Sequence, residues 1–134
     1  MVRGAGLNGT IKMSKEKLFH YKAKVTRVVD GDTVDATIDL GFDIHLKARI
    51  RFAGINAPES RTRDLVEKKA GLIAKDFVEQ WVDIEGKSII VQTQLDGKGK
   101  FGRILGRILN SEGECLNDKM LELGHATPYS GGKR

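Results

Sequence analysis

The sequence predicts an α+β domain that is mainly β with helices and is built around a small five-stranded Greek-key β-barrel. Three observations predict this fold class. Polar and apolar residues alternate with the period of a strand through three consecutive segments, near 19–25, 34–40 and 44–52. A long helical stripe of apolar residues follows them. Two further strand-like runs and a short helical run then complete the order βββαββα.

The first three segments are predicted to be consecutive strands. In the first, Tyr21, Ala23 and Val25 alternate with polar neighbours, and a tight turn follows at 30–32. Gly41 interrupts the alternation between the second and the third. The apolar residues that share one face of these two strands are Val34, Ala36, Ile38, Leu40, Ile44, Leu46, Ala48, Ile50 and Phe52.

The first helix is predicted from a start signal and an apolar stripe. Asp64 is a typical N-cap acceptor, and Glu67 lies three residues later, as in a capping box. Gly86 ends the helix. The stripe consists of Val66, Ala70, Ile73, Phe77 and Trp81, which recur at three- and four-residue steps.

The last three elements are shorter. Residues 88–93 and 103–109 are rich in residues that favour strands, and a glycine-rich connection at 96–102 separates them. Residues 116–123 form a short helical pattern that ends at Gly124, a residue suited to a left-handed cap. The complete order fits a barrel of the oligonucleotide-binding (OB) type.

Length and composition set further limits. The 134 residues suit one domain at 19–134, with residues 1–18 as a flexible N-terminal arm, either native or added in cloning. The net charge of +5 favours polyanionic partners only modestly. Cys115 is the only cysteine, which excludes an internal disulfide. No segment has the apolar length of a membrane span or a signal peptide, so we expect no membrane partner and a cytoplasmic monomer, although a mature secreted form would have the same sequence.

Two polar segments and two arginines suggest a chemistry. Asp30-Gly31-Asp32 joins the first two strands, Asn56-Ala57-Pro58-Glu59 follows the third, and Arg51 and Arg103 lie in or next to strands. Carboxylate and amide oxygens suit a hard cation, a carboxylate can activate water, and guanidinium groups bind phosphate oxygens. Each feature is common alone. Their combination and order supply what hydrolysis of a phosphodiester needs.

Three segments resemble the signature segments of the staphylococcal-nuclease-like (thermonuclease) family. They are VVDGDTV at 28–34, IRFAGINAPE at 50–59 and FGR at 101–103. The resemblance covers roughly residues 20–128. It implies an OB-fold barrel with calcium-dependent nuclease activity on DNA and RNA that leaves 3′-phosphates, and we expect single-stranded or locally opened nucleic acid as the partner.

The resemblance also implies a calcium site. Asp32 matches the family's first carboxylate ligand, Asn56 the second ligand, and Ala57 the position that contributes a backbone carbonyl. Better-known members have aspartate where this chain has Asn56. A neutral amide removes one negative charge, so we expect weaker calcium binding. The alternative is that Asp30, Asp32 and Asn56 only form turns.

Catalytic roles follow from the same matches. Glu59 aligns with the family's general base, and Arg51 and Arg103 align with the arginines that bind the phosphate and stabilise the transition state. Glutamates at strand ends are otherwise usually solvated. Arg49 and Arg107 lie outside the matched positions and are predicted to be ordinary surface residues.

Other candidates have weaker support. The loop at 98–101 could guide a nucleic-acid backbone, and Tyr129 lies close to where the family places tyrosines that pack on the nucleotide. His20, His45 and His125 share no metal-ligand spacing.

The competing function is a catalytically weak or inactive OB-fold module that only binds nucleic acid. The presence of Arg51, Glu59 and Arg103 favours the enzyme, whereas Asn56 keeps the binding module open.

Overall fold

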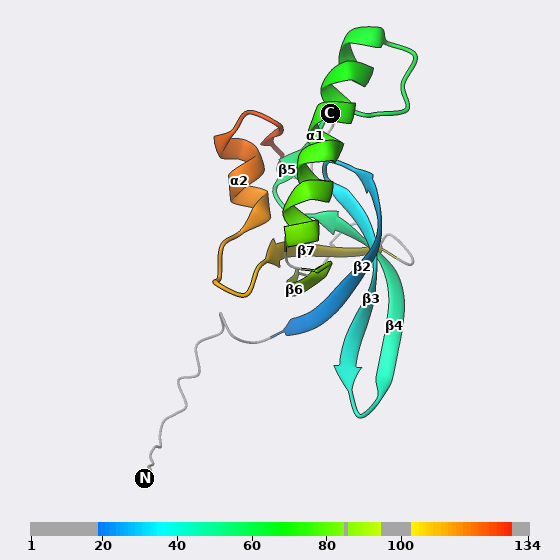
Figure 1. Cartoon of the computed structure of the whole chain (residues 1–134), viewed down its shortest axis with the longest axis vertical. Coiled ribbons are helices and arrows are strands. Elements are labelled where there is room, and N and C mark those ends of the chain that lie inside the picture. Colours follow the sequence, from blue (N-terminus) through cyan, green and yellow to red (C-terminus); the bar gives the residue numbers. More distant parts are fainter. Residues whose placement is uncertain (1–18, 85, 95–102, 130–134) are drawn as a thin grey trace.

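The computed structural model describes residues 19–84, 86–94 and 103–129, and its centre is a closed five-stranded barrel (Figure 1). The strand order is β2-β3-β4-β7-β6, and β6 pairs back with β2. Only β4 and β7 run parallel to each other. The predicted five-stranded OB-type barrel is therefore confirmed. The strand bounds are β2 His20–Asp30, β3 Thr33–Gly41, β4 Ile44–Phe52, β6 Ser88–Gln94 and β7 Arg103–Leu109.

Two helices and a small second sheet complete the fold. Helix α1 (Leu65–Ile84) connects the two halves of the barrel, and α2 (Leu116–Glu122) follows β7. Strands β5 (Ile55–Asn56) and β8 (Thr127–Pro128) pair antiparallel. The sequence did not predict these two strands, because two residues are too few to show a period. Neither described helix is long and apolar enough to cross a lipid bilayer.

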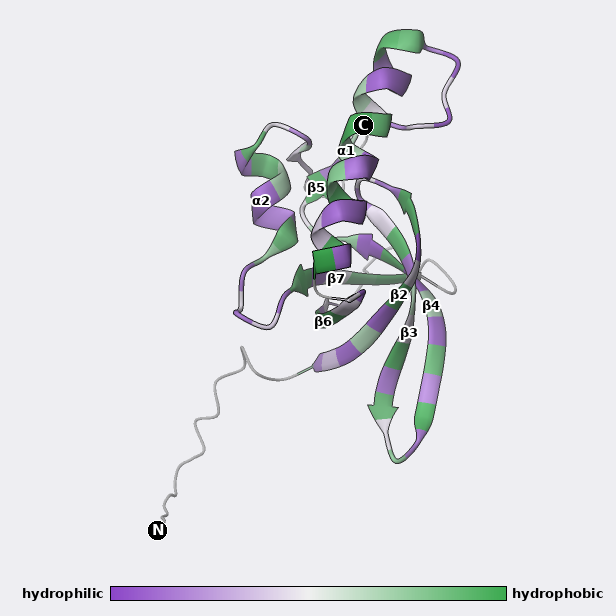
Figure 2. Ribbon diagram, viewed as in Figure 1, coloured by the Kyte–Doolittle hydropathy of each residue, from purple (hydrophilic) through white to green (hydrophobic). Residues whose placement is uncertain are grey.

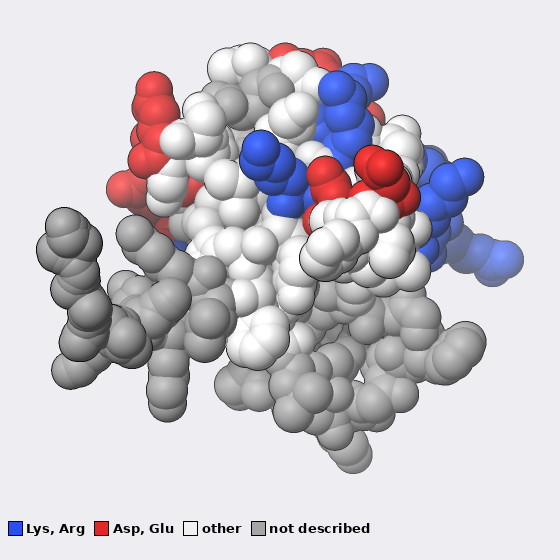
Figure 3. Space-filling view, turned by 90° about the horizontal axis from the view of Figure 1, so that it is seen from below, with Lys and Arg blue, Asp and Glu red and all other residues white. Residues whose placement is uncertain are grey.

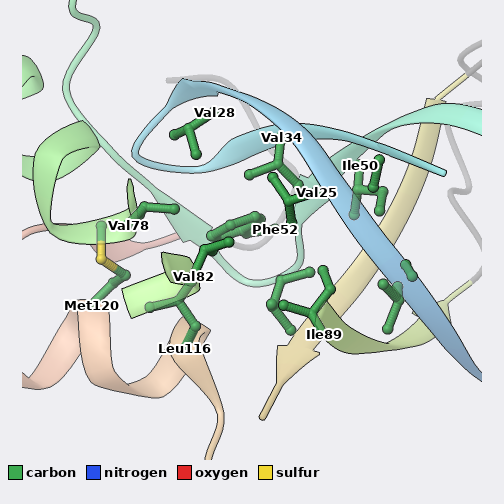
Figure 4. Packing of buried hydrophobic residues seen from close by; sticks show 14 of the residues in the cluster. Val25, Val28, Val34, Ile50, Phe52, Val78, Val82, Ile89, Leu116 and Met120 are labelled. Atoms are coloured by element: carbon green, nitrogen blue, oxygen red, sulfur yellow. The ribbon is translucent and has the colours of Figure 1, made fainter. Parts of the chain in front are cut away.

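The hydrophobic core lies inside the barrel and extends to both helices. Figure 4 shows side chains of α1 and α2 directed into the same cluster as those of the strands. Phe52, at the end of β4, is almost fully buried, and its burial stabilises the fold by about 1.5–3 kcal/mol. The labelled members are Val25, Val28, Val34, Ile50, Phe52, Val78, Val82, Ile89, Leu116 and Met120.

The packed face of α1 differs from the predicted stripe. The buried residues are Gly71, Ala74, Val78 and Val82. Phe77 and Trp81 lie at the edge of this face and are partly buried, whereas Val66 is 82 % exposed and Ile73 is 52 % exposed. The first turns of α1 extend beyond the barrel (Figure 1). The predicted stripe was wrong in the first half of the helix, where the small residues Gly71 and Ala74 form the packed face, because a count of large apolar side chains does not detect them.

The hairpin of β3 and β4 also extends beyond the barrel. Figure 2 shows hydrophobic and hydrophilic residues in turn along this hairpin, and residues 39–47 at its tip are all exposed. Phe42, in the connecting turn, is 97 % exposed. The alternation correctly predicts which side chains share a face, but it does not predict where the barrel ends.

A buried amide fixes α2 against the barrel. The Asn117 amide nitrogen donates to the carbonyl oxygens of Ala53 and Gly106, at 2.8 and 3.2 Å. Its carbonyl oxygen accepts from the Ile108 N–H at 3.0 Å. This side chain therefore satisfies backbone groups of both β7 and the turn after β4, from which the candidate site continues.

Candidate nuclease site

The turn between β2 and β3 is packed tightly against other parts of the chain. Gly31 is buried, and a Cβ atom added there would lie 2.8 Å from the Ala74 Cβ and 3.0 Å from the Ala57 Cβ. Glycine is needed here for this close approach. The turn therefore packs at Gly31 against both α1 and the segment that follows β5, and Asp32 is the next residue along the turn.

Asp32 is a buried carboxylate with several partners. It is 8 % exposed. One oxygen accepts the Thr33 hydroxyl at 2.8 Å, and the other accepts the Ala57 N–H at 2.9 Å. The Arg51 Nη1 lies 3.5 Å from that second oxygen. Asp32 therefore does more than form a turn, because it links the turn to two other predicted site residues.

Arg51 brings the predicted residues together. Its Nη1 donates to the Phe52 carbonyl oxygen at 3.1 Å, and its Nη2 donates to the Asn56 Oδ1 at 3.3 Å. Its guanidinium carbon lies 5.5 Å from the centre of the Tyr129 ring, within the range of a cation–π interaction. Asp32, Arg51, Asn56 and Tyr129 therefore form one cluster at the end of the barrel.

The small sheet explains how Tyr129 reaches this cluster. Asn56 pairs with Thr127 and Ile55 pairs with Pro128. The Tyr129 N–H then donates to the Gly54 carbonyl oxygen at 2.9 Å. Pairing of β5 with β8 thus places the tyrosine beside Arg51, and its role in packing on a nucleotide stays a prediction.

Glu59 is exposed, three residues after Asn56. Its backbone N–H donates to the Glu67 Oε2 at 3.2 Å. The Ser60 N–H and hydroxyl both donate to the Asp30 Oδ1, the former at 3.2 Å. Asp30 therefore has a long-range contact in addition to the turn role to which the sequence mainly assigned it.

Arg103 is placed only through its backbone. It is the first residue of β7 and pairs with Arg49 of β4, two residues before the pair formed by Leu105 and Arg51. Its side chain and the predicted guiding loop at 98–101 lie outside the described residues. The role of Arg103 therefore stays a prediction.

The oxygen atoms of the cluster are of the chemical type that a hard cation prefers as ligands. Asp32 offers a carboxylate, Asn56 an amide oxygen and Ala57 a carbonyl oxygen. However, the described residues contain no group of three or more His, Cys, Asp or Glu side chains that could hold a metal ion. Arg51 also lies beside the Asp32 and Asn56 oxygens, so a cation bound there would compete with its guanidinium.

A hollow of about 290 Å³ lies next to the cluster. It is lined by residues 56–58, Glu67 and residues 124–127. A larger hollow, of about 500 Å³, is lined by Lys22, Lys24 and other residues, none of them a predicted site residue. On the face seen in Figure 3, the basic and acidic side chains of the described residues are interspersed, so these residues form no broad field of one sign there.

The arginines that were predicted to lie outside the site have other partners. The Arg49 Nε donates to the Asp35 Oδ1 at 2.8 Å, and the Arg107 Nη2 donates to the Asp118 Oδ2 at 3.1 Å. The hydrogen bond from Arg49 is the main reason why the pKa of Asp35 lies below its usual value. The same contact raises the pKa of Arg49.

Three residues form contacts around Glu59 that were not predicted from the sequence. Glu67 was expected to complete a capping box, Asp30 to form a turn, and Ser60 was not singled out. Asp64 does cap α1, because its Oδ1 accepts from the Val66 and Glu67 N–H groups at 3.0 and 3.2 Å. A glycine inside a predicted helix was a usable signal, because Gly71 marks the point where α1 and the Glu59 segment meet.

The fold and the cluster together define a class of protein: an OB-type barrel with carboxylate, amide and guanidinium groups gathered at one end. The chain belongs to the family of staphylococcal nuclease homologues, whose family model matches residues 49–133. Arg51, residues 56–59 and Arg103 lie inside this match, and Asp32 lies before it.

Several known proteins are similar in sequence. Endonuclease YhcR of Bacillus subtilis is 30 % identical over 120 residues, which cover 81 % of this chain and 9 % of YhcR. Uncharacterized protein MJ1439 of Methanocaldococcus jannaschii is 29 % identical, with 82 % of this chain and 60 % of that protein covered. An uncharacterized endonuclease of Escherichia coli is 31 % identical, with 79 % and 60 % covered. The chain thus spans at most about three fifths of the length of these relatives.

Proposed function

We propose that this chain is a metal-dependent nuclease that hydrolyses phosphodiester bonds of DNA or RNA, in single-stranded or locally opened regions. The observation that carries the proposal is the convergence of Asp32, Arg51 and Asn56 at one end of the barrel, with Glu59 three residues further along. Family membership and the two relatives named as endonucleases support it.

The proposed mechanism assigns one task to each group. Asp32, Asn56 and the Ala57 carbonyl would hold calcium, whose charge offsets that of the scissile phosphate. Glu59 accepts a proton from the attacking water as the new phosphorus–oxygen bond forms. The bond to the leaving sugar oxygen breaks, and that oxygen takes up a proton. Arg51 and Arg103 donate hydrogen bonds to the phosphate oxygens, whose charge increases in the transition state.

The surroundings of Arg51 suit this role. Its side chain is only 13 % exposed, and its hydrogen bonds to Phe52 and Asn56 use two of its five N–H donors. A guanidinium that is already oriented loses little rotamer freedom when phosphate binds, so more of the interaction energy lowers the barrier.

The test is digestion of single-stranded DNA with calcium and with a chelator, side by side. We expect calcium-dependent loss of substrate. Glu59→Gln and Arg103→Lys should each lower kcat by about 10²–10⁴-fold. Arg107→Lys is the matched control, because Arg107 pairs with Asp118, and it should retain the normal rate. Near-normal rates in both site variants would refute the assignment.

The second candidate function is a module that binds nucleic acid without cleaving it. Two observations favour it: Asn56 replaces a carboxylate, and Arg51 lies where it partly neutralises Asp32. In that case the DNA would bind but stay intact in calcium, and the chelator would not change its affinity.

A further inference from the structure

The backbone around Glu59 is held at three points by residues outside the proposed reaction. The Glu67 carboxylate accepts from the Glu59 N–H at 3.2 Å. Asp30 accepts from both the N–H and the hydroxyl of Ser60. Gly71, one turn after Glu67, lies against the Glu59 carbonyl group. A Cβ atom added there would overlap that carbonyl and lie 2.7 Å from the Ser60 nitrogen.

We propose that Glu67, Asp30 and Gly71 are positioning residues that fix the direction in which the Glu59 side chain leaves the backbone. The inference rests on the proposed function, in which Glu59 is the general base. A base must come within about 2.6–3.2 Å of the proton that it removes. A displacement of about 1 Å can lower the rate about 10²-fold.

The contact of Glu67 is not explained by helix capping. In a capping box, the glutamate at the third helical position would bind the N–H of the cap residue. Here the Asp64 N–H donates to the Thr62 hydroxyl instead, at 3.2 Å. The Glu67 carboxylate is therefore directed away from its own helix end and toward Glu59.

The packing of α1 at Gly71 supports the same conclusion. Glycine inside a helix costs about 1 kcal/mol relative to alanine. At this position the missing side chain lets the α1 backbone contact the carbonyl of Glu59 directly. The helix thus acts as a rigid surface against which the base-carrying segment rests.

Asp30 connects this segment to the turn that carries Asp32. The two carboxylates of the turn accept N–H groups from opposite ends of the 57–60 segment, Asp32 from Ala57 and Asp30 from Ser60. This shared backbone segment therefore fixes the position of the proposed cation ligand, Asp32, relative to the proposed base, Glu59.

The kinetic test compares Glu67→Ala and Glu67→Gln with Glu79→Ala, an exposed glutamate of the same helix. We expect Glu67→Ala to lower kcat by about 10–100-fold with KM changed less than about twofold. Glu67→Gln should recover most of the rate, because an amide oxygen still accepts the Glu59 N–H. The Glu79→Ala control should match the unmodified chain.

A double-mutant cycle separates positioning from a general structural role. If Glu67 acts through Glu59, then Glu67→Ala should cause no further loss in a chain that already carries Glu59→Gln. An equal loss in both backgrounds would overturn the inference, and so would a normal rate in Glu67→Ala. A normal rate in Glu59→Gln would instead count against the proposed function.

Amide hydrogen exchange provides a readout that does not depend on activity. The Glu59 amide should exchange at least about tenfold faster in Glu67→Ala than in the unmodified chain, because it loses its acceptor. The Ser60 amide should respond in the same way to Asp30→Ala. Unchanged exchange of both amides would overturn the inference, even for a chain that cleaves no DNA.

Discussion

Two carboxylate–guanidinium pairs connect β3 and the turn before it with β4, and they differ in almost every property. Asp35 and Arg49 are direct cross-strand partners, and their two hydrogen bonds measure 2.8 and 3.2 Å. Their side chains are 28 % and 48 % exposed. The side chains of Asp32 and Arg51 are 11 % and 13 % exposed, and their nearest charged atoms are 3.5 Å apart. The closer pair is therefore the exposed one.

The difference shows that the shorter ion pair is not the one that lies among the predicted site residues. Asp35 and Arg49 form hydrogen bonds with each other, and both side chains are partly exposed to solvent. Arg51 lies opposite Thr33 rather than Asp32, so it reaches diagonally and shares its donors with Phe52 and Asn56. Under the proposed function, a buried pair whose members are shared among several groups can exchange partners with a substrate, whereas the exposed pair is expected to have only a structural role.

The largest expected difference in stability is between the two carboxylates. Asp32→Ala leaves the buried Ala57 N–H without its acceptor and should lower the free energy of unfolding by about 1–3 kcal/mol. Asp35→Ala should cost less than about 1 kcal/mol. Urea unfolding followed by the fluorescence of Trp81, the only tryptophan, measures both values. Equal losses would remove the distinction between the pairs.

A second effect, on calcium affinity rather than on folding, is expected from charge in the buried cluster. Asn56→Asp should tighten calcium binding by ~1 kcal/mol, the value for two unit charges about 4 Å apart in water-like surroundings. A less water-like site would give up to ~4 kcal/mol, but the Arg51 Nη2 competes for the same oxygen. Calorimetric titration with calcium and a nucleotide bisphosphate tests this. An unchanged affinity would mean that Asn56 does not face the cation.

The smallest effect concerns the pH dependence of the exposed pair. Because Arg49 lowers the pKa of Asp35, the pair stabilises the folded chain above about pH 4, and this contribution is lost as the pH falls through the folded-state pKa. The difference in unfolding free energy between the unmodified chain and Arg49→Ala should stay below about 1 kcal/mol and shrink in acid and in about 1 M salt. A difference that grows in acid would have the wrong sign.

Much of the fold could be predicted from the sequence because the signals are local. Alternation defined β3 and β4, Asp64 marked the start of α1, and Gly124 marked the end of α2. The face of α1 could not be predicted from its large apolar side chains, although Gly71 was a local sign of close packing. It depends on where Gly71 meets the Glu59 carbonyl, and that contact depends on the whole barrel.

The candidate site divides in the same way. Motif order was enough to bring Asp32, Arg51 and Asn56 together as candidates, and the structure places them in one cluster. The contact between Asp30 and Ser60 spans thirty residues, and no pattern in either segment indicates it. Such a partner becomes visible only when the chain has folded.

The comparison of Arg51→Lys with Arg49→Lys tests the central claim most directly. Both changes keep the charge on neighbouring outward positions of β4 and remove the planar guanidinium. If the buried pair is functional and the exposed pair is structural, kcat/KM for cleavage of single-stranded DNA in calcium should fall at least about 100-fold in Arg51→Lys and less than about twofold in Arg49→Lys. Equal rates in the two variants would contradict the account.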